Sequence, residues 1–348
     1  MQIAVAPARA DTYCRAVDLL ANDIERIAVE TAFSGVVRVD RGDTVELERA
    51  YGLADRAHGI ANAVDTRFAV ASAAKALTAL TVMSLVEDGT LALGTTARSI
   101  LGTDLPLIDD GVTVEQLLAH RSGIGDYLDE DGDLDLDAYL LPVPVHELAA
   151  TEQFLRVLDG HPTKFAPGTG FSYCNGGYVV LALLAERAVG LAFHDLAHER
   201  VCAPAGLTDT AYNRSDELPN RTALGYLSTT GLRTNVFHLP VRGNGDGGVY
   251  TTVADVAALW RALFAGRIVS PASVAEMVRP RSTTVSGRNR YGLGFWLDGT
   301  GPAVQLEGCD AGCSFRSVHD PGKGRTWSVV ANTTDGAWPL AERLAQLT

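Results

Sequence analysis

The chain has 348 residues, of which 47% are hydrophobic and 20% are charged, and its formal net charge is −13. This is the composition of an ordinary globular protein that is long enough to bury a core. The acidic balance, with no cluster of Lys or Arg, argues against nucleic acid and membrane surfaces as partners. No uncharged apolar run approaches the roughly 18 residues that a membrane span needs.

The N-terminal residues lack a basic start followed by an apolar segment, so we expect no signal peptide. If Met1 is the natural start, the expected location is cytoplasmic. The cysteines are odd in number and include no Cys-x-x-Cys pair, which favours free thiols over a disulfide framework. They are Cys14, Cys174, Cys202, Cys309 and Cys313.

The first elements follow from hydrophobic periodicity. Apolar residues at spacings of three and four predict a helix over residues 12–31. The segment "FSGVVRVDRGDTVELERAYGLAD" alternates around Arg41-Gly42-Asp43 and predicts a β-hairpin. A second helix is predicted over 72–89, with Gly89 as its stop.

The middle of the chain, residues 90–240, predicts helices over 148–159, 175–189 and 193–202, separated by Gly/Pro loops. A further helix over 252–265 has its predicted cap near Thr252. The last part of the chain predicts four strands, then a closing helix over 336–347: "YGLGFWLD", "AVQLEGCD", "CSFRSVHD" and "RTWSVVANT".

This order predicts an α/β (α+β) fold in which an antiparallel sheet is flanked by terminal helices and interrupted by a helical insertion. We expect residues 1–71 and 241–348 to form the sheet domain and residues 72–240 a mostly helical domain. An active site at their junction is the natural place for a cleft.

Three short motifs carry candidate chemistry. Ser72 and Lys75, one helical turn apart, lie on one face, where a lysine near a serine hydroxyl can act as its base. Tyr173 and Asn175 stand in the Gly-rich turn of "GTGFSYCNGGY", although a core tyrosine and a helix-capping asparagine would explain them as well. In "EGCDAGCSF", residues 307–315, a strand edge with Gly312 would allow close approach of a substrate, or simply form a bulge.

Together the three motifs resemble the signature of the penicillin-recognising serine enzymes. The neighbouring segments "VTVEQLLAHRSGI" and "GDGGVYTTVADVAAL" extend the likeness to about residues 30–345. The chain thus resembles the family of class C β-lactamases, D-alanyl-D-alanine carboxypeptidases and related esterases. This resemblance implies the β-lactamase/penicillin-binding-protein fold and a serine hydrolase that works through an acyl-enzyme.

The resemblance also implies a role for each motif residue. Ser72 would be the acylated nucleophile, Lys75 its base and Tyr173 the proton shuttle. Asn175 would hold the acyl side chain of the substrate. The N–H groups of Ser72 and Gly312 would form the oxyanion hole.

The chain departs from the family pattern at one place. Relatives carry Lys-Thr-Gly or His-x-Gly where this chain has Cys309-Asp310-Ala311. The cation of those motifs attracts a substrate carboxylate, which a cysteine does not. We therefore place Cys309 and Asp310 in the substrate-binding strand and expect a neutral ester, an amide or an acyl-transfer substrate.

Other interpretations stay open. His194 and His198 in "HDLAH" share a helical face as in zinc peptidases, but Asp195 replaces the usual Glu and no third ligand is evident. Cys309, Asp310 and Cys313 lack a second ligand pair, and Cys309 as a second nucleophile lacks a base. We expect no metal and no cofactor.

Two alternative functions remain. One is a transacylase that passes the acyl group to an amine or alcohol, and the other is a binding module that has lost catalysis. The expected partner is a small ester, amide or peptide-like molecule. Its specificity pocket would be lined by Tyr127, the loop 138–146 and the "RGNGDGG" turn, with Arg242 or Arg316 as alternative sources of positive charge.

Overall fold

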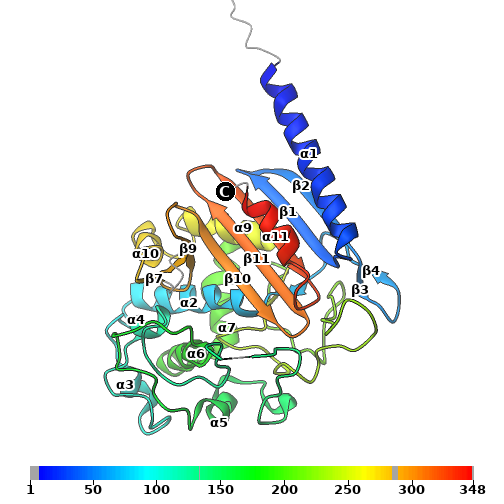
Figure 1. The fold of residues 1–348 in the computed structure, drawn as a ribbon. Coiled ribbons are helices and arrows are strands. Elements are labelled where there is room, and N and C mark those ends of the chain that lie inside the picture. Colours follow the sequence, from blue (N-terminus) through cyan, green and yellow to red (C-terminus); the bar gives the residue numbers. More distant parts are fainter. Residues whose placement is uncertain (1–7, 133, 284–288, 347–348) are drawn as a thin grey trace, which may run out of the picture.

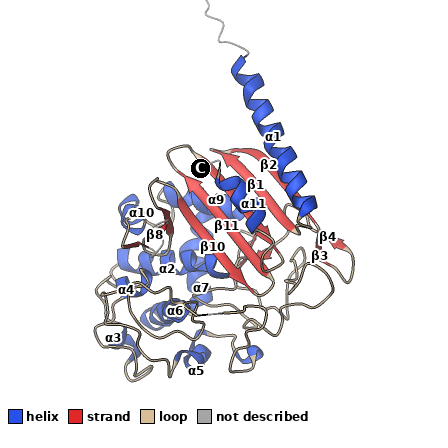
Figure 2. Ribbon diagram, in the orientation of Figure 1, coloured by secondary structure: helices blue, strands red, loops and turns tan. Residues whose placement is uncertain are grey.

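An eight-stranded antiparallel sheet forms the centre of the protein (Figures 1 and 2). The computed structural model describes residues 8–132, 134–283 and 289–346. The strand order is β2-β1-β12-β11-β10-β9-β8-β7. The strands are β1 (Gly35–Arg41), β2 (Thr44–Tyr51), β7 (Ser282–Thr283), β8 (Asn289–Tyr291), β9 (Trp296–Asp298), β10 (Val304–Asp310), β11 (Cys313–Asp320) and β12 (Arg325–Ala331).

The sheet joins segments that are far apart in the sequence. Strand β1 pairs with β2 on one side and with β12 on the other, in a register that runs from Gly35 opposite Ala331 to Arg41 opposite Arg325. The predicted hairpin and the antiparallel sheet are therefore confirmed.

Successive side chains of the central strands pack into two different hydrophobic cores, because side chains along a β-strand alternate between the two faces of the sheet. Val37 and Val39 pack with α1 (Ala8–Glu30) and α11 (Trp338–Ala345), which cover one face of the sheet (Figure 1). Val36 on the same strand faces the larger core, which contains α2 (Lys75–Glu87), α6 (Asn175–Val189) and α9 (Val253–Phe264). The site lies on this second side.

In the sequence, a region of helices and loops separates the N-terminal strands β1 and β2 from the C-terminal strands of the sheet. The α-helices of this region are α2, α3 (Ala97–Leu101), α4 (Val114–Leu118), α5 (Leu155–Leu158), α6, α7 (Phe193–Ala197) and α8 (Ala203–Ala205). Short helical turns occur at Ala71–Ala74, Val145–Glu147, Thr151–Phe154 and His198–Cys202, and α10 (Pro271–Met277) follows α9. Two small ladders pair β3 (Leu53–Asp55) with β4 (Ile60–Ala61), and β5 (Phe68–Ala69) with β6 (Tyr250–Thr251).

Several predicted elements agree closely with the structure. The helix predicted over 175–189 is α6, and the Thr252 side chain accepts a hydrogen bond from the Asp255 N–H at the start of α9. The predicted helix over 72–89 is α2, except that its first turn is a 3-10 helix.

Two predicted elements are wrong. The segment 291–298 is the end of β8, a turn and β9, because Gly294 has φ of +90° and reverses the chain. The helix predicted over 148–159 is only a 3-10 turn followed by the single turn α5, since the Gln153 side chain binds the N–H groups of Ala149 and Ala150 and starts the helix later.

Within the described ranges, no single helix has both the length and the hydropathy of a membrane span. One pair bent by 89°, Asn175–Val189 with Phe193–Ala205, meets the criteria by length and composition only.

Candidate active site

The candidate nucleophile stands in a tight helical turn beneath the sheet. Ser72 belongs to the 3-10 helix Ala71–Ala74, which leads directly into α2. Ala71, the residue before it, has φ of +45°, a left-handed conformation that costs a non-glycine residue about 1–2 kcal/mol. Such strain is typical of functional sites, where the surrounding structure imposes the conformation.

Strand β10 fixes the position of this turn through Gly308. A Cβ atom on Gly308 would lie 2.1 Å from the Val70 carbonyl oxygen and 2.8 Å from the Ser72 nitrogen. Only a residue without a side chain lets the strand and the turn approach so closely. Gly308 thus permits the contact between β10 and the turn, and the close approach of a substrate at Gly312 stays a prediction.

Lys75 is 2% exposed and its ammonium group is surrounded by three acceptors. Its Nζ lies 2.9 Å from Ser72 Oγ, 2.7 Å from Asn175 Oδ1 and 2.8 Å from the Asp246 carbonyl oxygen. An ammonium has three N–H donors, so the cage satisfies all of them. After Lys75 loses one proton, its two remaining N–H groups donate to Asn175 Oδ1 and to the Asp246 carbonyl oxygen. The lone pair of its nitrogen then faces Ser72 Oγ.

Tyr173 lies beside this pair, with the Lys75 Nζ 4.9 Å from its ring centroid. Burial raises the pKa of Tyr173 well above its ordinary value, and a hydrogen bond with the Ser72 hydroxyl opposes that rise. The phenol is therefore protonated at neutral pH and available as a proton donor. Trp296 stacks on its ring at 5.7 Å, with 10° between the planes, and holds it in place.

His120 also packs against Tyr173, and the sequence reasoning missed it. Its ring centroid lies 4.3 Å from that of Tyr173, and its Nδ1 accepts the N–H of Cys174 at 3.0 Å. The ring is buried, and burial together with the Lys75 charge lowers its pKa well below the ordinary value. A neutral imidazole therefore packs against the phenol.

Asn175 begins α6 and is fully engaged. Its Oδ1 accepts from Lys75, while its Nδ2 donates to the Leu128 carbonyl at 2.9 Å and to Glu130 Oε1 at 2.8 Å. Asp126 accepts the N–H groups of Asn175 and Gly176 at 2.6 and 2.8 Å, which anchors the start of the helix. The structure thus places Asn175 as a positioning contact for Lys75.

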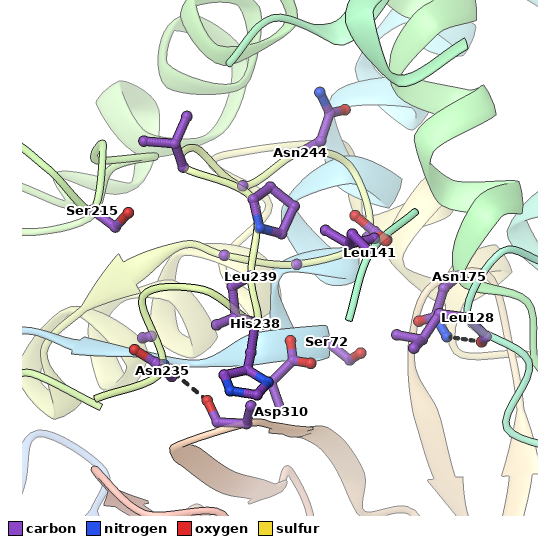
Figure 3. A pocket seen from close by; sticks show the side chains of 18 of the residues that line it. Ser72, Leu128, Leu141, Asn175, Ser215, Asn235, His238, Leu239, Asn244 and Asp310 are labelled. Carbon is purple, nitrogen blue, oxygen red and sulfur yellow. Dashed lines mark hydrogen bonds between the residues drawn. The ribbon is translucent and has the colours of Figure 1, made fainter. Parts of the chain in front are cut away.

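Two pockets meet at Ser72. The first, the Asp310 pocket, is lined by Ser72, Asn175 and Asp310, which Figure 3 shows, and by Tyr127 and Asp246 among others. The second is the Trp296 pocket. It is lined by Ser72, Glu130, Asp131, Gly132, Leu134, Leu136, Tyr173, Trp296, Glu307, Gly308 and Cys309.

Adjacent residues of β10 serve different pockets, because successive strand residues point to opposite sides. Cys309 lines the Trp296 pocket, and its Sγ donates to the Thr334 carbonyl at 3.4 Å. Burial raises the pKa of its thiol to about 12. Asp310 lines the Asp310 pocket. Gly312 lies in the turn after β10, with φ of +73°, and its N–H donates to Thr334 Oγ1 at 2.9 Å.

The two pockets are acidic. Among the described residues, no Lys or Arg lines either of them, apart from Lys75 behind Ser72. Arg242 donates to the Tyr212 carbonyl, and Arg316 binds Glu307 Oε2 at 2.5 Å. These two arginines, which the sequence offered as other sources of positive charge for a substrate, therefore already have partners in the protein. Asp246 is buried and accepts the Tyr127 hydroxyl, and burial raises the pKa of this carboxyl.

The residues weighed as metal ligands lie elsewhere. His194 is buried and its Nε2 lies 2.8 Å from the Gly243 carbonyl oxygen, while His198 begins the next helical turn. Within the ranges that the structure describes, no three His, Cys, Asp or Glu side chains gather as a metal centre. Cys309 and Cys313 are free thiols near the β10–β11 turn.

The fold and the Ser72–Lys75 pair define a class, and the chain belongs to the Beta-lactamase family, whose profile matches residues 20–347. It is 27% identical over 272 residues to the putative penicillin-binding protein PbpX of Bacillus subtilis, covering 77% of this chain and 63% of that protein. It is 34% identical over 197 residues to esterase EstB of Burkholderia gladioli, covering 55% and 49%.

Solved structures give the same relationship. A penicillin-binding protein from Bacillus halodurans superposes with a TM-score of 0.87 at 32% identity, over 93% of this chain and 99% of that one. Among the curated sequence relatives, a D-aminopeptidase of Brucella ovis is 28% identical over 274 residues, which cover 77% of this chain and 49% of that protein. The chain thus spans about half to two thirds of the curated relatives that it matches.

Proposed function

We propose that the protein is a serine hydrolase that cleaves an ester or amide bond of a small molecule through an acyl-enzyme. The observation that carries this proposal is the 2.9 Å contact between Lys75 Nζ and Ser72 Oγ at the meeting point of two pockets. Relatives named as an esterase and as D-aminopeptidases support the reaction class.

In the acylation step, Ser72 Oγ attacks the carbonyl carbon of the substrate and its proton passes to Lys75 Nζ. The bond from that carbon to the leaving amine or alcohol breaks, and the phenol of Tyr173 donates the proton that the leaving group needs. Tyr173 regains a proton from Lys75, so the step leaves an ester on Ser72 and no net charge change. Water then adds to this ester, returns a proton to Ser72 and releases the acid.

The oxyanion hole in this proposal consists of the N–H groups of Ser72 and Gly312. Donors placed where negative charge develops supply a large share of the rate enhancement. Because the Gly312 N–H binds Thr334 Oγ1 without substrate, this role requires it to exchange that hydroxyl for the substrate oxygen. The role of Gly312 stays a prediction, as do the two-domain division and a cytoplasmic location.

The proposal is tested by acylation of Ser72. Incubation with a neutral p-nitrophenyl ester is expected to add one acyl group per chain, detected by intact-mass spectrometry. Peptide mapping should place the group on Ser72, and Ser72→Ala should form no adduct. Acylation at another residue, or none at all with esters and a fluorophosphonate probe, would contradict the mechanism and favour the non-catalytic binding module.

A second prediction concerns Cys309 and substrates with a free carboxylate. A lysine or histidine at this place would give a charge-assisted bond to a carboxylate of about 1.5–3 kcal/mol, which a thiol does not supply. Glu130 lines the same pocket without a cationic partner among the described residues and repels an anion further, whereas Asp131 and Glu307 are paired with Lys164 and Arg316. The ratio of kcat/KM for a carboxylate substrate to kcat/KM for its methyl ester is therefore expected to be roughly 10- to 100-fold lower in the wild type than in a site that carries a lysine or histidine at this place.

Cys309→Lys should move this ratio toward the carboxylate substrate, and Cys309→Ser is the matched control that adds no charge. The measurement is kcat/KM for the carboxylate and its methyl ester in all three proteins. A wild type that already prefers the carboxylate would overturn the inference about the substrate.

A further inference from the structure

The two pockets at Ser72 have different chemical roles in the proposed reaction. The leaving group must lie near the group that protonates it, and Tyr173 lines the Trp296 pocket but not the Asp310 pocket. The part of the substrate that stays on Ser72 as the acyl group therefore extends into the Asp310 pocket. Specificity for the acyl group is set by the side chains of that pocket.

Asp310 is the charged group in this pocket that has no partner. Asp246 also lines it, but the Asp246 carboxylate accepts the Tyr127 hydroxyl. In the part of the chain that the structure describes, no hydrogen bond or ion pair reaches the side chain of Asp310, and no Lys or Arg lines the pocket. Figure 3 shows its carboxylate pointing into the same space as Ser72.

The carboxylate is also close to the nucleophile turn. A methyl group on Gly247 would lie 3.8 Å from Asp310 Oδ2 and 3.6 Å from the backbone of Ala71, the residue before Ser72. The carboxylate and the turn are thus within reach of a single small substituent. A substituent near the carbonyl of an acyl group on Ser72 would share this pocket with Asp310.

Apolar side chains line part of this pocket, beside several polar ones. Leu128, Leu141, Val236 and Leu239 line it, and Tyr139 is held there by its hydroxyl, which donates to the Tyr127 carbonyl at 2.7 Å. An acyl group that fits this pocket combines a polar group near the carbonyl with an apolar body.

From these contacts we propose that the acyl part of the substrate carries an ammonium group close to the scissile carbonyl, bound by the Asp310 carboxylate. This inference rests on the proposed acyl-enzyme function and names the substrate class of the same site. The Asp310 carboxylate is half-buried and has no partner among the described residues, and a substrate cation supplies the missing charge. Asp310 then acts as a specificity-determining residue.

The ionisation of Asp310 supports the same assignment. Burial raises the pKa of its carboxyl to about 7, the nearby charges of Asp246 and Glu130 add to the rise, and Lys75 opposes it. His238 also lines the pocket, with its Nδ1 3.0 Å from the Tyr139 carbonyl oxygen. A bound cation would favour the ionised form, so binding of an ammonium should strengthen as the pH rises through about 7.

The test compares glycine phenyl ester with phenyl propionate, which differ by an ammonium in place of a methyl group. Each kcat/KM is divided by the rate constant of the same ester with hydroxide, so that intrinsic reactivity cancels. At pH 7 the wild type is expected to prefer the ammonium substrate by about 10-fold or more, as a charge-assisted contact implies. A wild type without this preference overturns the inference.

Asp310→Asn keeps the shape of the side chain and removes its charge. It is expected to lower the ammonium-to-methyl ratio by about 10- to 100-fold. Asp43→Asn is the matched control, because it makes the same change in net charge in the exposed β1–β2 turn. An unchanged ratio in Asp310→Asn, or an equal fall in Asp43→Asn, would contradict a specific contact.

The pH arm uses a substrate whose charge is fixed, the phenyl ester of trimethylammonioacetic acid, against its neutral isostere, phenyl 3,3-dimethylbutanoate. The ratio is expected to rise between about pH 6 and 8 in the wild type and to stay flat in Asp310→Asn. If neutral esters acylate Ser72 but no ammonium preference exists, only this inference fails. If neither substrate acylates Ser72, the proposed function fails as well.

Discussion

Replacement of Lys75 by alanine is expected to lower the turnover of an ester by about 10³-fold or more, because the change removes the group that takes the Ser72 proton. Lys75 touches Ser72, Asn175 and the Asp246 carbonyl, so its loss also leaves three acceptors without a donor. Lys323→Ala is the matched control, since Lys323 is an exposed surface lysine whose nearest acidic partner, Asp320, lies 3.7 Å away.

The same experiment tests whether Lys75 and Tyr173 act together. Residues that share one proton relay give losses that do not multiply. Tyr173→Phe alone should therefore cause a large loss, yet the double variant should be little slower than Lys75→Ala. The measurement is kcat/KM for a neutral ester in the two single variants and the double variant. Losses that multiply would assign the two residues to separate steps.

Gly308→Ala is expected to be the most damaging single methyl group near the site. The new Cβ would overlap the Val70 carbonyl oxygen and crowd the Ser72 nitrogen, both of which are backbone atoms that cannot rotate away. We expect the free energy of unfolding to fall by about 1–3 kcal/mol, as in overpacked cores. Displacement of Ser72 by about 1 Å should slow acylation by about 10²-fold.

Gly94→Ala provides the control for this substitution. Its Cβ would meet no heavy atom within 4 Å, so both stability and acylation should stay close to the wild type. Urea unfolding and the rate of adduct formation are measured on the two variants side by side. A Gly308→Ala protein that is as stable and as reactive as Gly94→Ala would show that β10 does not set the position of the nucleophile.

The sequence predicts the fold best where structure follows from local patterns. Helix α6 and the cap of α9 at Thr252 agree with the prediction because they depend on periodicity and a short-range hydrogen bond. The segment 291–298 misleads because its apolar residues suit a strand, whereas the conformation of Gly294 makes a turn. A glycine can continue a strand or form a turn, and the residues around Gly294 do not predict which of the two conformations it adopts.

The site is predictable to a similar degree. The contact between Ser72 and Lys75 follows from their spacing on one helical face, and the resemblance places Tyr173 near them. The carbonyl of Asp246 and the ring of His120 were missed because both reach the site through tertiary contacts from distant loops. Their contributions come from backbone atoms and ring packing, which have no signature in a single sequence.

The pairing of β1 with β12 has a consequence for the order in which the chain acquires its structure during synthesis. Strand β1, residues 35–41, is synthesised almost 300 residues before its partner β12. The loop between the two strands must close before the centre of the sheet can form. The nucleophile turn depends on β10, which also emerges late. A nascent chain in which β1 has paired only with β2 therefore exposes the other edge of β1 through most of translation. Chaperone binding during that interval is the expected cost of building one sheet from both ends of the chain.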